Sequence, residues 1–237
     1  YSLIEGGQDS IVTNDNGTVI WGDGNIDVDP MFVDAENDNF QLLASSMLIN
    51  AGHPDSTDSD GSIADIGTYP YLNSYSGPTW YITESGNDST ATGASGDPFR
   101  SIQAGINFSS DDDSVTVAAG TYVENINFRG RNIKVVGEDR ETTIINPSDY
   151  IKPVVDFYGD AYGEMSASLL SNFTISGSGY SPESNYGALR IVYGPRPRIE
   201  ECIFVNNYKV LRIDAAAPTF NNNLFYNNDV LIDWGPN

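Results

Sequence analysis

Short apolar runs alternate with polar corners through most of this 237-residue chain. Four runs have the alternating or β-branched character that is typical of strands, and they lie at 114–117, 132–136, 143–145 and 153–157. Glycine, asparagine, aspartate and serine separate the runs, and the 23 glycines favour tight turns because glycine tolerates left-handed backbone conformations. The pattern therefore predicts a protein made of many short strands.

One segment has the signals of a helix. Asp97 is placed to cap its N-terminus, Pro98 fits the first helical position, and apolar side chains recur at 99, 102 and 106. We therefore expect a helix of about three turns over 98–107, with one apolar face.

An internal repeat lies near the C-terminus. Residues 197–207 align with residues 218–228 at an offset of 21, and each copy ends on two asparagines. An earlier copy begins at Asn172. A period near 21 that is built from strands and Asn/Gly corners is typical of a solenoid, in which successive coils stack as parallel strands about 4.8 Å apart.

The repeat also predicts which side chains lie together. Phe173, Ile203 and Leu224 begin the apolar run of each copy, so we expect them to form one inward-facing stack. Asn206 and Asn227 follow that run, and we expect them to stack at a turn. Hydrogen bonding between coils and simple turn formation both explain asparagine there.

Three motifs are more specific: Trp80-Tyr81-Ile82, the run GDPFRSIQA at 96–104 and the run DSVTVAAGTY at 113–122. With them, residues 79–146 resemble the opening of a secreted right-handed parallel β-helix domain of the pectin-lyase-like type. In that family a short helix caps the open end of the solenoid, so the resemblance implies this role for residues 98–107.

The N-terminal part of the chain resembles the closing part of the same kind of domain. The resemblance rests on NIDVDPMFV at 25–33, NFQL at 39–42, INAG at 49–52 and ADIGTY at 64–69. We therefore expect an all-β right-handed parallel β-helix with a short capping helix, split across the chain in permuted order. Its expected parts are a closing segment with an acidic loop at 1–72, a linker at 73–78, and the capping helix with the first coils at 79–237.

This order has two explanations. Either the chain crosses the junction of two tandem domains, or separate chains assemble head to tail, so that the N-terminal segment of one copy completes the solenoid of another. Open solenoid ends expose unpaired backbone groups and apolar core, and a head-to-tail contact need not close into a ring. The residues that we expect at such an interface are Tyr1, Leu3, Ile4, Leu231, Ile232 and Trp234.

Charge narrows the possible partners. Eleven Lys and Arg against 33 Asp and Glu give a formal net charge of −22, which argues against binding to nucleic acid or to anionic lipid. No apolar run approaches the roughly 18 residues that a membrane span requires. The single cysteine, Cys202, excludes an internal disulfide framework, and its apolar surroundings predict a buried thiol. The resemblance implies an extracellular or cell-surface location.

One acidic run is a candidate calcium site. Asp55, Asp58, Asp60 and Asp65 surround Gly61, and carboxylates at alternating positions before a glycine resemble the oxygen ligands of calcium loops. A Ca²⁺ ion would relieve the repulsion among these carboxylates. The alternative is a solvated acidic turn.

Signals for catalysis are few. His53 is the only histidine, so triads and metal sites that need several histidines are excluded. The resemblance implies a Gly-His-Gly and an Arg-x-Lys motif for hydrolases of galacturonans, and the sequence contains neither.

A basic and aromatic region remains a candidate for glycan binding. Five of the eleven basic residues lie within 190–212. Arg196 and Arg198 are candidates to hold uronate carboxylates, and Tyr186 and Tyr193 are candidates to stack on sugar rings. The alternative is that the cations pair with neighbouring carboxylates.

We therefore predict a non-catalytic extracellular structural protein that associates with copies of itself, as a head-to-tail fibre subunit or as a tandem-repeat surface stalk. Two alternatives stay open: a carbohydrate-binding or adhesive module, and a polysaccharide lyase that acts on acidic glycans.

Overall fold

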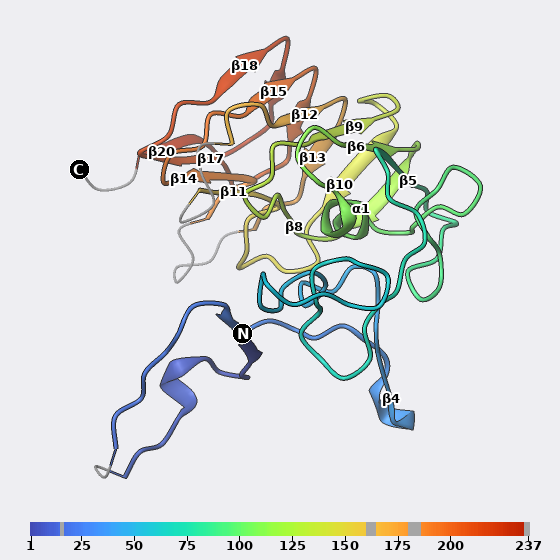
Figure 1. Cartoon of the computed structure of the whole chain (residues 1–237). Coiled ribbons are helices and arrows are strands. Elements are labelled where there is room, and N and C mark those ends of the chain that lie inside the picture. Colours follow the sequence, from blue (N-terminus) through green and yellow to red (C-terminus); the bar gives the residue numbers. More distant parts are fainter. Residues whose placement is uncertain (15–16, 160–164, 180–185, 235–237) are drawn as a thin grey trace.

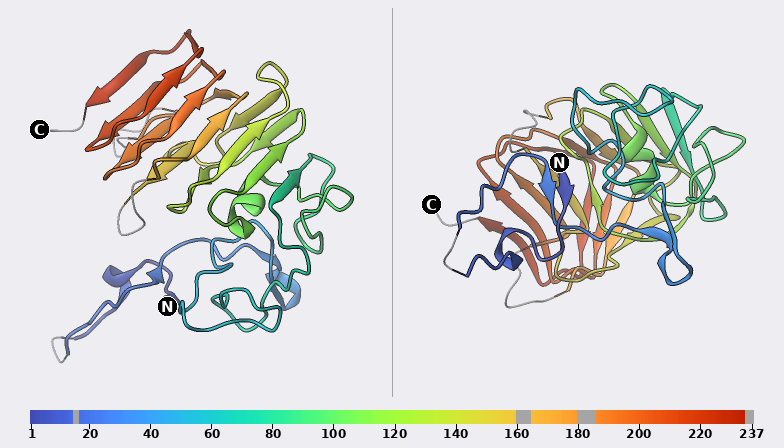
Figure 2. Two further views of the ribbon diagram at one scale, coloured as in Figure 1. Left: turned by 45° about the horizontal axis from the view of Figure 1, so that its top comes forward. Right: turned by 60° about the horizontal axis from the view of Figure 1, so that its bottom comes forward.

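The computed structural model describes residues 1–14, 17–159, 165–179 and 186–234 (Figure 1). From residue 79 onward the chain winds into a solenoid whose strands form three parallel sheets. The predicted all-β parallel β-helix is therefore confirmed. Figure 2 shows the stacked strands of successive coils side by side.

From β6 (Ser114–Val117) onward each coil contributes one strand to each sheet, and β5 (Thr79–Ile82) adds one more strand to the first sheet. The first sheet contains β5, β6, β9 (Lys134–Gly137), β12 (Leu169–Ser171), β15 (Arg198–Glu200) and β18 (Thr219–Asn221). The second contains β7 (Gly120–Val123), β10 (Thr143–Asn146), β13 (Thr174–Ser176), β16 (Ile203–Val205) and β19 (Leu224–Tyr226). The third contains β8 (Ile126–Asn127), β11 (Val155–Tyr158), β14 (Leu189–Val192), β17 (Lys209–Asp214) and β20 (Val230–Trp234). All four predicted strands are present, and two of them begin two residues later than expected.

Apolar ladders fill the inside of the solenoid. In the second sheet, Ile145 pairs in register with Ile175, Ile175 with Phe204, and Phe204 with Phe225. The rings of Phe204 and Phe225 stack with centroids 4.9 Å apart and planes within 8°. Each coil thus buries its apolar side chain against the same position of the coil before it.

The predicted stack of Phe173, Ile203 and Leu224 is wrong by one residue. Ile203 does pair with Leu224, but Thr174 rather than Phe173 lies opposite Ile203. The inward positions are the next ones along the strands, and Leu224 is 47% exposed. Phe173, which precedes β13, is fully buried in the core as predicted, whereas Ile203 and Leu224 lie on the other face of their strands from the inward Phe204 and Phe225.

The helix is shorter than predicted. Helix α1 (Ile102–Phe108) begins after Ser101, whose side chain accepts a hydrogen bond from the Ala104 N–H. Asp97 does not cap it, because its side chain accepts hydrogen bonds from Thr92 instead. Phe99 is held in extended backbone beside β5, where its N–H donates to the Tyr81 carbonyl at 3.0 Å. Strand pairing therefore outcompetes the local signal for an earlier helix start.

The N-terminal segment contains little regular structure. Strands β1 (Ser2–Leu3) and β2 (Asn25–Ile26) pair in parallel, and β3 (Phe32–Asp34) and β4 (Asn39–Leu42) form an antiparallel hairpin. Two short 3-10 helices, η1 (Gln8–Ser10) and η2 (Ala35–Asn37), lie between strands. Figures 1 and 2 show this segment beside α1, at the end of the solenoid opposite to β18, β19 and β20.

Helix α1 links the two parts of the chain. It contacts β5, β6 and β8 on one side, as expected for a cap on the solenoid. On the other side the Asn107 side chain donates hydrogen bonds to the carbonyls of Ala44 and Ser46, at 3.0 and 2.8 Å. Tyr71 and Phe108 pack against both the solenoid core and a smaller apolar cluster around Leu48 and Ile49. The N-terminal segment is thus fixed to the start of the solenoid.

Candidate functional site

The carboxylates of the predicted calcium loop act mainly as acceptors for backbone N–H groups. Asp58 accepts from the Asp65 N–H at 2.9 Å, and Asp60 accepts from the Asn73 N–H at 2.8 Å. Asp55 points away from them, with a side chain that is 92% exposed. Within the described residues, no group of three or more His, Cys, Asp or Glu side chains is placed to hold a metal ion.

Asp65 is the most buried member of this loop. Its two oxygens accept from the N–H groups of Asn50 and Tyr71, both at 2.8 Å. Burial raises the pKa of Asp65 to about 6, and the nearby charges of Asp58 and Asp60 act in the same direction. Asp65 therefore links the segment at Asn50 to the segment at Tyr71 through hydrogen bonds. Calcium binding stays a prediction, and comparing the melting temperature in calcium and in chelator tests it.

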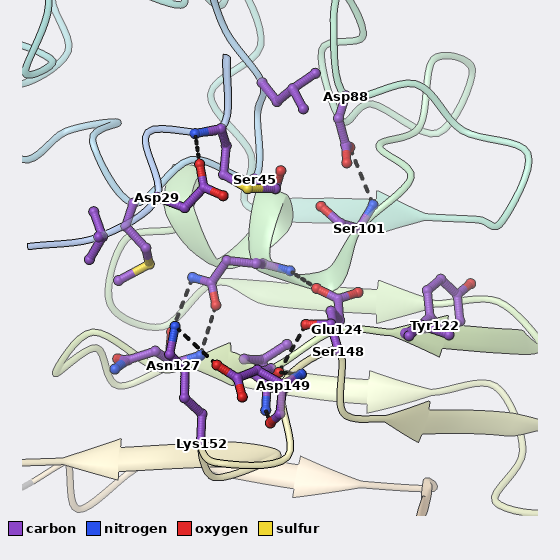
Figure 3. A pocket seen from close by; sticks show the side chains of 18 of the residues that line it. Asp29, Ser45, Asp88, Ser101, Tyr122, Glu124, Asn127, Ser148, Asp149 and Lys152 are labelled. Atoms are coloured by element: carbon purple, nitrogen blue, oxygen red, sulfur yellow. Dashed lines mark hydrogen bonds and ion pairs between the residues drawn. The ribbon is translucent and has the colours of Figure 1, made fainter. Parts of the chain in front are cut away.

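A second group of carboxylates lies in a half-open cavity of about 810 Å³ between the N-terminal segment and the flank of the solenoid (Figure 3). Glu124 accepts from the N–H groups of Ile102 and Gln103, at 2.8 and 3.0 Å. Asp88 accepts from the Arg100 N–H at 2.8 Å. These carboxylates satisfy free N–H groups at the start of α1, where negative charge is also favourable.

Burial also raises the pKa of Glu124 to about 7. This role of Glu124 could not be predicted from local sequence, because Glu124 lies 22 residues from its partner Ile102. Only the winding of the chain brings the two together.

Two of the predicted glycan-binding residues surround an ion pair on the outer face of the third sheet. Arg190 donates to both carboxylate oxygens of Asp156, at 2.7 and 2.5 Å. Its guanidinium lies 5.0 Å from the ring centroids of both Tyr158 and Tyr186. Tyr193 packs edge-on against Tyr158 at 5.2 Å and is 56% exposed. Sequence reasoning did not single out Arg190 as the cation at this place.

The two predicted arginines lie elsewhere. Arg198 is on β15 in the first sheet, where it forms an ion pair with Glu200 at 3.4 Å. Arg196 is exposed in the turn that precedes β15. The four predicted residues therefore occupy two different sheets or their turns, and glycan binding by them stays a prediction.

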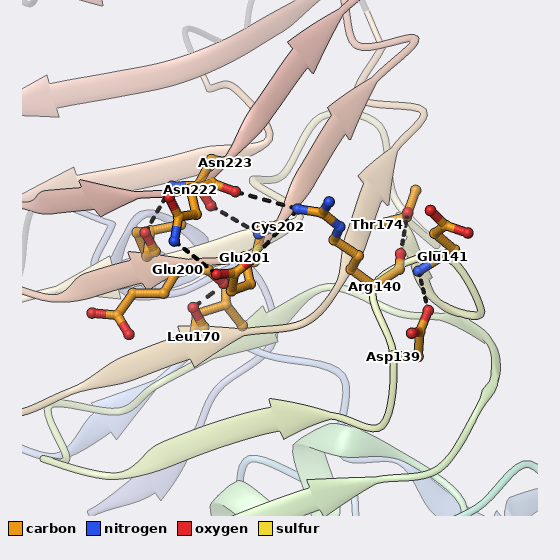
Figure 4. A network of polar contacts seen from close by, with 11 residues as sticks. Asp139, Arg140, Glu141, Leu170, Thr174, Glu200, Glu201, Cys202, Asn222 and Asn223 are labelled. Carbon is orange, nitrogen blue, oxygen red and sulfur yellow. Dashed lines mark hydrogen bonds and ion pairs between the residues drawn. The ribbon is translucent and has the colours of Figure 1, made fainter.

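Polar side chains line one corner of the solenoid (Figure 4). Asn223 accepts from the Cys202 N–H at 2.9 Å and donates to the Ile199 carbonyl at 2.7 Å. Arg140 and Asn222 both contact the Glu201 carboxylate, at 3.4 and 2.9 Å. Each contact joins residues on different coils, so the corner stabilises the stacking.

The predicted asparagine stack is also present. The Asn227 side chain donates to the Asn206 side chain, and the Asn206 N–H donates to the Asn227 carbonyl at 3.1 Å. Both residues have positive φ, so they serve as turn residues and as links between coils. Cys202 is fully buried, as predicted, and burial raises the pKa of its thiol to about 12.

The last described coil leaves one end of the solenoid open. Strands β18, β19 and β20 each pair on one side only within the part of the chain that the structure describes. Between them lies a hollow of about 500 Å³. Its lining is entirely apolar: Leu211, Ile213, Ala216, Ala217, Pro218, Phe220, Phe225, Leu231 and Ile232.

Two predicted interface residues, Leu231 and Ile232, line this hollow and are 49% and 39% exposed. Trp234 lies on β20, but its side chain is outside the described part of the structure.

The other predicted interface residues lie on β1 or next to it, at the opposite end of the molecule. Leu3 packs against the N-terminal apolar cluster, and the Ile4 N–H donates to the Ile26 carbonyl at 3.0 Å. Tyr1 is 44% exposed, with its ring 5.0 Å from that of His53. Strand β1 pairs only with β2 among the described residues, so its outer edge is open.

Comparison with known proteins supports the fold and leaves the activity open. A family model described as a protein of unknown function, DUF1565, matches residues 84–129, which include α1 and strands β6 to β8. That family is associated with pectin-lyase-like β-helix proteins, in agreement with the resemblance at the level of fold. No curated protein and no solved structure matched the chain. Within the described residues, no helix has the length and apolar character needed to cross a membrane.

Proposed function

We propose that this protein is a non-catalytic structural unit of an extracellular rod, in which β-helices join end to end. The proposal rests on one observation: the two ends of the described structure present different surfaces. One end presents the edges of three sheets around an apolar hollow, and the opposite end presents a parallel pair, β1 and β2, with an open edge.

Covering the first end with the second would pair β1 with a strand at the open end and continue that sheet. The hollow exposes apolar surface that gains free energy when water is excluded, and the strand edges gain hydrogen-bond partners. Because the two surfaces differ, each added copy leaves a new free end, which gives a linear assembly. The same junction serves separate subunits of a fibre and successive repeats of a surface stalk.

A rod also requires a stiff connection between the closing segment and the solenoid that follows it. Residues 44–50 provide such a connection because they are hydrogen-bonded to Asn107 and share apolar contacts with Phe108. Arg129 adds a hydrogen bond to the Ile49 carbonyl at 2.8 Å. The N-terminal segment therefore transmits force to the solenoid instead of moving as a loose tether.

Carbohydrate binding is the second candidate function. The exposed ring of Tyr193, beside Tyr158 and Arg190, favours it because aromatic faces stack on sugars. Saturable binding of oligogalacturonate without turnover would support this role. A lyase would instead turn over the polysaccharide, and Arg190 is a poor base for that reaction while it holds Asp156.

Sedimentation velocity over a range of protein concentrations tests end-to-end association. We expect the wild-type chain to form larger species as concentration rises. Ile232→Asp places a charge in the hollow and should weaken association at least about tenfold, since burying an unpaired charge is costly. The matched control is Leu224→Asp, on the same coil but on the outer face, which should associate like the wild type. Equal behaviour of the two variants, or a monomer throughout, would contradict the proposal.

A further inference from the structure

We infer that the chain between β1 and β2 forms a complete coil of the solenoid when a second copy of this protein covers its open edge. The apolar runs at 10–13 and 18–21 would then become strands on β20 and β18 of that second copy. This inference rests on the proposed end-to-end function and names the segment that makes the contact.

Spacing is the first observation. Leu3 pairs with Ile26, an offset of 23 residues. Coils of the solenoid repeat at offsets from 20 residues, between Ser114 and Lys134, to 35 residues, between Lys134 and Leu169. The chain from β1 to β2 therefore has the length of one coil.

Side-chain bonding between β1 and β2 follows the same rule as in the solenoid. Asp27 accepts a hydrogen bond from the Gly6 N–H at 3.0 Å, across 21 residues. In the solenoid, Asn223 accepts from the Cys202 N–H at 2.9 Å, also across 21 residues. A polar side chain on the later strand thus holds the backbone of the earlier coil in both places.

What lies between β1 and β2 differs from every formed coil. After β16 the chain forms β17 and β18 before it reaches β19. Between β1 and β2 the described residues form only the short helix η1, and Figure 1 shows this part of the chain projecting away from the body. The two strands that a coil contributes to the third and first sheets are missing here.

The sequence of the projecting part nevertheless suits strands. Its two runs are Ser-Ile-Val-Thr and Thr-Val-Ile-Trp, which are rich in β-branched residues. Val12 is 79% exposed and Ile20 is 90% exposed, whereas Val210 and Leu211 on β17 are at most 4% exposed. No strand of the described residues pairs with these two runs.

The open end of a second copy supplies that coil. If β1 lies on β19, the order of the chain places the first run on β20 and the second run on β18. Strands β16, β17 and β18 follow the same order, because they belong to the second, the third and the first sheet in turn. The backbone of both runs then gains partners, and their apolar side chains cover the hollow.

The distribution of charge is compatible with a second copy as the partner. Residues 1–72 contain thirteen Asp and Glu but neither Lys nor Arg. The coils next to the open end, within 186–234, contain five basic and five acidic residues, whereas residues 79–185 contain six basic and fifteen acidic residues. The acidic segment is therefore repelled less at these coils than along the rest of the solenoid.

Hydrogen exchange measured by mass spectrometry tests the inference on the full chain. Amides of residues 10–13 and 18–21 should exchange freely in dilute monomer and at least about tenfold more slowly in the associated state. Val12→Asp and Ile20→Asp should each weaken association at least about tenfold by sedimentation velocity. Both side chains are already exposed in the monomer, so these variants should fold normally.

Val123→Asp is the matched control, because Val123 is 63% exposed on β7, away from both ends. It should associate like the wild type. Association without slower exchange in the two runs would overturn this inference and leave the end-to-end function standing. A chain that stays monomeric at every concentration would overturn the function itself.

Discussion

At the scale of single residues, buried charges hold the coils together. Asp156 and Arg190 lie opposite each other on neighbouring strands, and their side chains are 9% and 19% exposed. Two tyrosine rings cover the guanidinium. A buried ion pair adds little net stability, but loss of one partner is costly because the other charge stays buried.

Arg190→Gln should therefore lower the free energy of unfolding by about 3 kcal/mol, measured by urea denaturation. The exposed Arg196→Gln is the control, and its effect should stay within about 0.5 kcal/mol. Adding Asp156→Asn to Arg190→Gln should recover part of the loss, since it removes the unpaired charge. Equal effects of the two single variants would contradict this role for the pair.

Glu124 makes stability depend on pH. Its pKa in the folded protein is about 7, against 4.5 for a free glutamate, so the native state binds the proton more tightly than the unfolded state. The free energy of unfolding should therefore fall as pH rises through this window, by at most about 3 kcal/mol. The raised pKa of Asp65 acts in the same direction up to about pH 6.

Urea unfolding at pH 5 and at pH 8 tests this dependence. Glu124→Gln should reduce the difference between the two pH values, because the side chain no longer titrates. Glu5→Gln, at an exposed carboxylate, should leave the difference unchanged. If Glu124→Gln also leaves the difference unchanged, the pH effect belongs to other groups.

Residue types alone predicted some of these contacts. The burial of Cys202 follows from its apolar run, and the Asn206–Asn227 stack follows from the repeat. The partners of Glu124 and Asp65 could not be read from the sequence, because they lie on turns that meet only after the solenoid is wound. For the same reason, the acidic loop looks like a cation site in sequence, whereas in the structure its carboxylates accept hydrogen bonds from backbone N–H groups.

At the scale of elements, α1 is the link between the N-terminal segment and the solenoid. Asn107 is fully buried and uses its whole side-chain amide. Its amide nitrogen donates to the carbonyls of Ala44 and Ser46. Its amide oxygen accepts from the side chains of Gln103, at 3.0 Å, and Arg129, at 2.9 Å. Few other side chains of the described residues connect so many separate segments.

Asn107→Ala should cost about 3 kcal/mol, because it leaves several buried groups without partners. Amide exchange in residues 44–50 should become faster while the coils beyond β9 keep their protection. Asn87→Ala, which removes surface contacts to Ser89 and Thr90, is the control and should have little effect. Unchanged exchange at 44–50 would show that other contacts fix the N-terminal segment.

Strand positions were predicted well because each strand is bounded by turn residues that mark the corners. The face of the strands was harder to predict. The apolar run Cys-Ile-Phe-Val at 202–205 does not alternate, so its inward residues depend on the register with neighbouring coils. The start of α1 was predicted too early because Phe99 pairs with β5, a contact that local sequence does not encode.

At the scale of the whole molecule, the winding of the solenoid was predictable from the repeat, but the packing of the N-terminal segment against it was not. The closing segment lies against the α1 end of the solenoid and leaves the other end open. In the proposed rod, each chain carries both halves of a junction, at opposite ends. This arrangement gives the proposed rod its direction and makes the copies equivalent.

Electron microscopy of the purified chain in millimolar Ca²⁺ tests this proposal most directly. The account predicts filaments whose axial repeat is the length of one chain, with the β-helix axis along the filament. Ile232→Asp should abolish the filaments, and Leu224→Asp should preserve them. Dispersed single particles of the wild-type chain, at concentrations where its fold is intact, would contradict the end-to-end account.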